Sequence, residues 1–163
     1  MSRLSLPVTN KEVIDACASE AASAHGKDEE GAEFSTTLKL AWALAHSERC
    51  EVDARRAIEM LSGLRERERR RGSSESRELA YLLAVAHYRL ADYAAAKEWC
   101  ERALKAANGT CRQSSALLRE CETLLAEDAL VGLAGVGALL AGVVLVGAAL
   151  LGGGGGGRSR GRN

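Results

Sequence analysis

One uninterrupted apolar stretch, residues 129–151, constrains this chain more than any other feature. It contains 23 residues without a charge and directly follows Glu127 and Asp128. With a rise of about 1.5 Å per residue, a helix of this length would extend about 34 Å, more than the roughly 30 Å of a bilayer's hydrocarbon core. We therefore predict a single membrane-spanning helix over 129–151. The alternative is a buried hairpin or helix of a soluble domain, although such elements are rarely apolar on every face.

The position of this stretch predicts the topology of the chain. Few residues follow Leu151, so we expect insertion after translation, with the N-terminus and residues 1–128 in the cytosol. The first seven residues contain one arginine and no apolar core, which argues against a secretory signal peptide. A glycine run and three arginines, which we take as a targeting tail, follow the stretch: Arg158, Arg160 and Arg162.

The composition of the predicted anchor suggests a thin membrane. It is rich in Gly and Ala and lacks Trp and Tyr, so its hydrophobicity is moderate. This favours the mitochondrial outer membrane or the peroxisome over the secretory pathway. A row of small residues would let two anchors approach closely, so a homo-oligomer is one expectation. The residues assigned to the anchor are Ala129, Gly132, Ala134, Ala138, Gly142 and Leu151.

The remaining residues read as an all-α domain. Aromatic content is low, Pro7 is the single proline, and the apolar residues recur with helical periodicity. Five cysteines show neither CxxC pairs nor histidines at ligand spacing, so we expect no metal and no cofactor. The predicted helices cover 10–23, 34–48, 52–67, 76–90, 93–107 and 110–127.

Two of these helix pairs resemble each other. The second is a tetratricopeptide-like repeat, with a short turn at Asp92 and a small residue, Ala96, early in its second helix. Ala57 fills the same position in a more degenerate first copy. We thus predict a six-helix bundle containing two such repeats. The expected organisation is an N-terminal helix or arm with an acidic linker (1–33), a helical domain (34–128), the anchor (129–151) and a Gly/Arg tail (152–163).

Three short stretches resemble one family, the mitochondrial fission 1 proteins. The sequence LAVAHYRL at 83–90 is similar to the family's LAVGNYRL, LAWAL at 40–44 to its YAWCL, and DALVG at 128–132 to its DGLVG. Residues 1–35 match only by pattern. The resemblance implies a non-enzymatic adaptor at mitochondria, often also at peroxisomes, that recruits a dynamin-related GTPase directly or through an adaptor. The alternative is a tail-anchored receptor for chaperone-delivered or imported proteins.

Repeat geometry predicts which side chains line a partner-binding groove. We expect aromatic anchors at Trp42, Tyr81 and Tyr88, because rigid aromatics with polar tips are common interface hot spots. Alternatively, these three aromatic side chains pack in the core of the domain. The full set expected on the concave side is Lys39, Trp42, His46, Arg49, Glu78, Tyr81, Val85 and Tyr88.

Catalytic motifs are lacking from the sequence: no GxxxxGK[ST], HExxH or GxSxG occurs. The run RERERRR at 65–71 is basic and could contact anionic lipid or nucleic acid. The interleaved Glu66 and Glu68 favour a solvated helix end instead. We expect no nucleic-acid partner.

Overall fold

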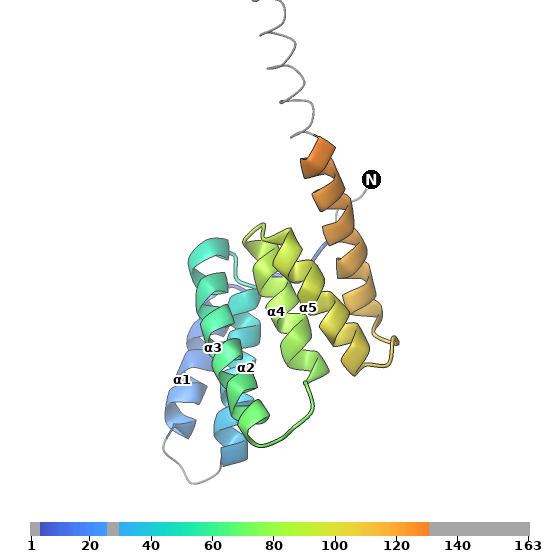
Figure 1. The fold of residues 1–163 in the computed structure, drawn as a ribbon. Helices are drawn as coiled ribbons and strands as arrows, with labels where there is room; N and C mark the ends of the chain where they lie inside the picture. Colours follow the sequence, from blue (N-terminus) through green and yellow to red (C-terminus); the bar gives the residue numbers. More distant parts are fainter. Residues whose placement is uncertain (1–3, 26–29, 131–163) are drawn as a thin grey trace, which may run out of the picture. The chain divides into compact units, whose positions relative to one another are not determined.

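Figure 1 shows the fold as a computed structural model, which describes residues 4–25 and 30–130. The chain divides into two units, Met1–Leu125 and Ala126–Asn163. Of the second unit, the described residues 126–130 are helical. The predicted span 129–151 lies outside the described residues except for its first two positions, and so does the tail 152–163. Within the described ranges, no helix combines the length and apolar character that a membrane crossing requires.

The described part of the first unit contains six helical stretches, which confirms the all-α prediction. They are α1 (Lys11–Ala24), α2 (Glu30–Ala45), α3 (Cys50–Arg70), α4 (Arg77–Arg89), α5 (Tyr93–Ala106) and a sixth stretch over 112–125. α2 packs on α3 and α4 packs on α5, as two helical hairpins (Figure 1). α2 also contacts α4, and α1 covers α2. This pairing is the one expected for two consecutive repeats.

Local chemistry fixes where the helices begin. The side chain of Asn10 accepts a hydrogen bond from the Val13 amide at 3.1 Å, and that of Asp92 accepts one from Ala95 at 3.2 Å. Ser76 caps α4 in the same way, through the amide of Leu79. Each cap satisfies an N–H group that the first helical turn leaves without a backbone partner.

α3 and α4 are each followed by a residue in the left-handed backbone conformation. Gly72 (φ +73°) follows α3, and the Ser73 amide donates to the Glu68 carbonyl at 3.1 Å. Ala91 (φ +57°) follows α4, and the Asp92 amide donates to His87 at 3.0 Å. Both turns are Schellman motifs, but only the first uses the glycine that this conformation favours.

Small residues let the paired helices pack closely. Ala57 in α3 and Ala96 in α5, the two positions matched by the repeat prediction, are fully buried. They belong to one core that also contains Leu61, Leu83 and Leu117. Larger side chains at the two alanines would overfill this core, which explains the sequence pattern.

Both boundaries of α2 differ from the prediction. α2 begins at Glu30 rather than at residue 34, because Glu33 pairs with Arg67 of α3 at 3.3 Å and extends the helix into the polar linker. α2 ends at Ala45 rather than at residue 48, because the backbone beyond it hydrogen-bonds to Thr9 instead of continuing the helix.

Candidate functional site

A hollow of about 230 Å³ lies where α2, α4 and the start of the sixth helix meet. We call it the groove pocket. It is lined by Trp42, Arg77, Glu78, Tyr81, Leu82, Cys111 and Gln113. Three of these residues, Trp42, Glu78 and Tyr81, were predicted from repeat geometry to line a groove.

Trp42 presents a large apolar surface on α2. Its side chain is 39% exposed, and its ring lies on the His46 ring with centroids 4.8 Å apart and planes tilted by 35°. His46 Nδ1 lies 2.9 Å from the Trp42 carbonyl oxygen. Burial lowers the pKa of His46, so the imidazole beneath the indole is neutral near pH 7. One face of the indole therefore packs on the His46 ring, and the other face is exposed to solvent.

Tyr81 and Glu78 lie one turn apart on α4. Tyr81 is half-buried, and burial raises the pKa of its phenol, which keeps the hydroxyl protonated at neutral pH. Glu78 is exposed in the first turn of the helix. The phenol offers a hydrogen-bonding tip on an apolar body, and the carboxylate supplies one negative charge at the rim.

Cys111 brings a thiol to the same pocket. Burial alone would raise the pKa of Cys111, but hydrogen bonds from the Ser114 hydroxyl, at 3.1 Å, and from the backbone amides of Ser114 and Gln113 hold it below the ordinary value. The four cysteines whose side chains are described (Cys17, Cys100, Cys111 and Cys121) are all free thiols.

The other predicted groove residues do not line this pocket. Lys39 is exposed and pairs with Glu20 of α1 at 2.7 Å. Tyr88 packs against the core, with its ring 5.7 Å from that of Tyr93. His46 (1% exposed) and Val85 (0%) are buried in the fold.

Arg49 is also exposed, but it borders a different hollow, together with Thr9. Of the predicted anchor, Ala129 is helical and exposed. Gly132, Ala134, Ala138, Gly142, Leu151 and the three tail arginines lie outside the described residues.

The extended segment 4–9 covers part of α2 and α4. The Thr9 amide donates to the His46 carbonyl at 2.7 Å, and the Glu48 amide donates to the Thr9 carbonyl at 3.2 Å. Arg89 of α4 donates to the Pro7 carbonyl at 2.9 Å. Leu4 and Leu6 pack against the core. The N-terminal segment is therefore an integral part of the repeat domain, which the sequence pattern did not reveal.

The sequence analysis did not predict four of the pocket residues: Arg77, Leu82, Cys111 and Gln113. A signal for Cys111 was present, because it stands 34 residues after Arg77, about one tetratricopeptide repeat length. Continuing the repeat register by one helix would have placed the start of the sixth helix beside α4.

The dimensions of the pocket indicate what it can hold. It is smaller than the roughly 300–1,000 Å³ of most small-molecule sites. Among the described residues, no cluster of three or more His, Cys, Asp or Glu side chains could hold a metal ion. An open hollow with two aromatic rings, one cation and one carboxylate fits one or two side chains of a protein segment.

Known proteins resemble this chain in sequence and in fold. Residues 77–130 match the family model for the Fis1 C-terminal tetratricopeptide repeat. The chain is 31% identical to mitochondrial fission 1 protein B of Arabidopsis thaliana over 85% of its length and 78% of that protein. It is 33% identical to mitochondrial fission 1 protein of Yarrowia lipolytica, over 72% and 70% respectively.

A solved structure shows the same fold. The crystal structure of fission protein Fis1 from Saccharomyces cerevisiae superposes with a TM-score of 0.63 at 19% identity. The match covers 78% of this chain and 92% of that one. At this identity the likeness concerns the fold alone, a six-helix, tetratricopeptide-like domain.

Proposed function

Because the chain belongs to the mitochondrial fission 1 protein family, we propose that it is a membrane-tethered adaptor that promotes mitochondrial fission by docking a protein partner. The observation that carries the proposal is the groove pocket, where Trp42 and Tyr81 present aromatic surface beside a carboxylate. Large aromatic side chains dominate binding energy at many interfaces, and a single truncation often costs about 2 kcal/mol or more. The pocket supports a role in protein binding, and the names of the related mitochondrial fission 1 proteins support a role in mitochondrial fission.

We propose that residues 129–151 are the tether, with the helical domain on the cytosolic face of the mitochondrial outer membrane. The support is the 23-residue uncharged stretch and its length relative to a bilayer. Its Gly- and Ala-rich composition also suits the peroxisomal membrane, so we extend the proposal to peroxisomal fission. The tail arginines Arg158, Arg160 and Arg162 would lie on the far side of the membrane.

The partner in this proposal is a dynamin-related GTPase or an adaptor that binds one. Such a partner would offer an extended or helical segment with an apolar side chain for the two aromatic rings. A cationic group near it would meet Glu78, and an anionic group would meet Arg77, since both side chains line the pocket. This is recognition of a short segment in a groove, for which repeat domains are suited.

The receptor alternative requires a different surface. A clamp for the acidic C-terminus of a chaperone needs several cationic side chains converging in one groove. The groove pocket has one, Arg77, and it lies beside Glu78. Lys39, a further candidate, is paired with Glu20. The geometry therefore favours the fission adaptor.

Live imaging of a fluorescent fusion, intact or cut after Asp128, tests the proposal in cells depleted of the native protein. We expect the intact fusion to encircle mitochondria and restore their division, and the cut form to be diffuse and inert. Placement on the endoplasmic reticulum, or normal division without the protein, would contradict the adaptor. Normal division with impaired protein import would support the receptor instead.

A further inference from the structure

The loop between α3 and α4 lies outside the groove pocket and has arginines just before two serines. It follows the basic run at 65–71 and begins with Gly72, Ser73 and Ser74. Arg70 and Arg71 stand three and two residues before Ser73, and Arg71 also stands three residues before Ser74. Charge patterns of this kind are how kinases select their substrates.

The backbone leaves both hydroxyls accessible. Residues 73–76 form neither helix nor strand, and the side chains of Ser73 and Ser74 are exposed. The Ser73 amide closes the last turn of α3 on Glu68, whereas Ser76 is committed as the cap of α4. The accessible acceptors of this loop are therefore Ser73 and Ser74, and an extended substrate conformation requires unwinding only the end of one helix.

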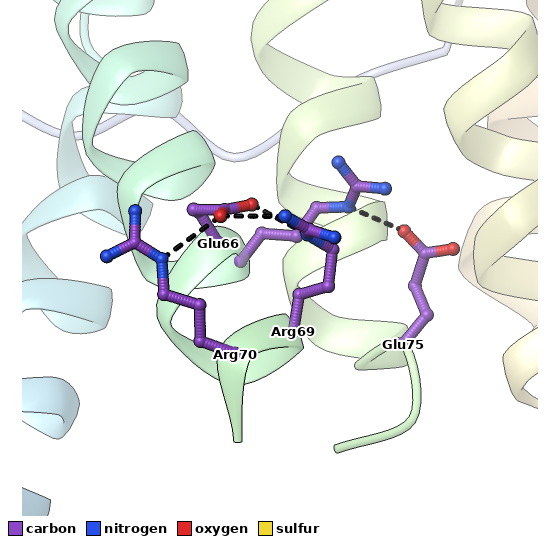
Figure 2. A network of polar contacts seen from close by, with 5 residues as sticks. Glu66, Arg69, Arg70 and Glu75 are labelled. Carbon is purple, nitrogen blue, oxygen red and sulfur yellow. Dashed lines mark hydrogen bonds and ion pairs between the residues drawn. The ribbon is translucent and has the colours of Figure 1, made fainter. Parts of the chain in front are cut away.

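Arg69 and Arg70, which precede this loop, form solvent-exposed ion pairs. Figure 2 shows Arg69 and Arg70 converging on the carboxylate of Glu66, with N···O distances of 2.8 and 3.1 Å. Both arginine side chains are more than 70% exposed. Solvent-exposed ion pairs of this kind contribute little to stability. An acidic kinase cleft can therefore take over these guanidinium groups at little cost.

We propose that Ser73 and Ser74 form a phosphorylation site for a protein kinase that recognises arginine on the N-terminal side of its acceptor. The serine Oγ attacks the γ-phosphorus of a nucleoside triphosphate. A new O–P bond forms, the bond to the β,γ-bridging oxygen breaks, and the nucleoside diphosphate leaves. The hydroxyl proton passes to the catalytic aspartate of the kinase.

A phosphate on this loop would lie beside the junction of α3, α4 and α5. A hollow of about 100 Å³ here is lined by Arg65, Glu68, Arg69 and residues 73–76. The Glu75 carboxylate pairs with Arg65 at 2.8 Å and lies 3.8 Å from Arg102 of α5.

Arg65 and Arg102 also lie over the Trp99 ring, 4.9 and 4.7 Å from its centroid. A phosphoserine carries a charge of about −1.5 to −2 and three acceptor oxygens, so it would compete with Glu75 for these guanidinium groups. Phosphorylation would thus replace the ion pairs of Glu75 with Arg65 and Arg102, which join the two repeats, by ion pairs of the phosphate with these arginines.

The first test treats the full-length chain in detergent micelles with MgATP and the catalytic subunit of cyclic-AMP-dependent protein kinase. Tandem mass spectrometry should map about one phosphate per chain to Ser73 or Ser74. The double variant S73A/S74A should lose this phosphate, and S62A, an exposed serine of α3 without an arginine in the three residues before it, should keep it.

The arginines provide the specific control. The variant R70Q/R71Q keeps both hydroxyls but should lower kcat/KM for the kinase roughly tenfold or more, because two charge contacts with the kinase are lost. Phosphate found only outside residues 73 and 74, or equal rates for R70Q/R71Q and the unaltered chain, would overturn the proposal.

A second measurement follows the phosphate after transfer. If Arg65 and Arg102 bind it, ³¹P NMR should give a second phosphate pKa below its ordinary value of about 6, and R65Q should raise it again. An ordinary pKa in the phosphorylated chain would show that the phosphate does not engage the α3–α5 junction.

Discussion

Replacing Thr9 by valine should release the N-terminal segment from α2. Thr9 is 7% exposed, and its Oγ1 donates to the Ala43 carbonyl at 2.6 Å. In an uninterrupted helix the Ala43 carbonyl would accept from Ser47, but the Ser47 amide donates to Leu44 at 3.1 Å instead. The Thr9 hydroxyl therefore satisfies a carbonyl at the end of α2.

The loss of stability in Thr9→Val comes from the Ala43 carbonyl, which the substitution leaves buried without a hydrogen-bond donor. Valine keeps the shape of threonine but cannot donate, so a buried carbonyl loses its partner, at a cost of about 1–3 kcal/mol. The matched control, Thr9→Ser, keeps the hydroxyl and loses one methyl group, at a cost of about 0.8 kcal/mol. We expect Thr9→Val to be the more destabilising of the two, by about 1 kcal/mol.

Two assays detect the loss. Urea unfolding of residues 1–128 should show a midpoint lowered by roughly 0.5–1.5 M for Thr9→Val at an unchanged slope. Amide hydrogen exchange at Thr9, whose N–H donates to His46 at 2.7 Å, should become faster even if the segment detaches without unfolding the domain. The reasoning fails if both measurements are unchanged, or if serine is as harmful as valine.

Three further predictions concern charge, core and backbone. The hydrogen bonds of Glu66 with two arginines lower its pKa to about 2 from the ordinary 4.5. Because the pKa of Glu66 is lower in the folded state, the ion pair stabilises the fold above pH 4.5, and this contribution is lost as the pH falls through about 2. NMR titration of the Arg69→Gln variant should show a higher pKa of Glu66. Leu83→Ala, at a fully buried position, should cost about 2–5 kcal/mol in urea unfolding, and a loss below about 1 kcal/mol would contradict its place in the core. Gly72→Ala should destabilise the domain and Ala91→Gly should stabilise it, each by about 1 kcal/mol, because both positions have positive φ. If thermal unfolding showed that both substitutions lower Tm, or that both raise it, the two turn conformations would be contradicted.

Periodicity predicted the helices because helical packing repeats every few residues and the caps are local. Ala57 and Ala96 identified the helix pairs since only small residues fit where such helices meet. The same logic placed Trp42 and Tyr81 at the pocket. Those parts of the fold depend on spacing within one repeat, which a sequence displays directly.

The rest depends on contacts between distant segments. Residues 4–9 have no periodicity, so their backbone bonds to His46 and Glu48 could not be read from the sequence. His46 and Val85 occupy groove positions of an ideal repeat but are buried in this fold. The start of α2 depends on Glu33 reaching Arg67 across 34 sequence positions.

The central claim is that a membrane-tethered groove drives fission, and the most direct measurement is rescue of mitochondrial division by full-length variants. The variant W42A/Y81A removes both aromatic rings of the groove pocket, and V52A, at a 70% exposed position of α3, is the matched control. Circular dichroism first establishes that both fold. We predict that both reach mitochondria and that only V52A restores division. Full restoration by W42A/Y81A would contradict the claim.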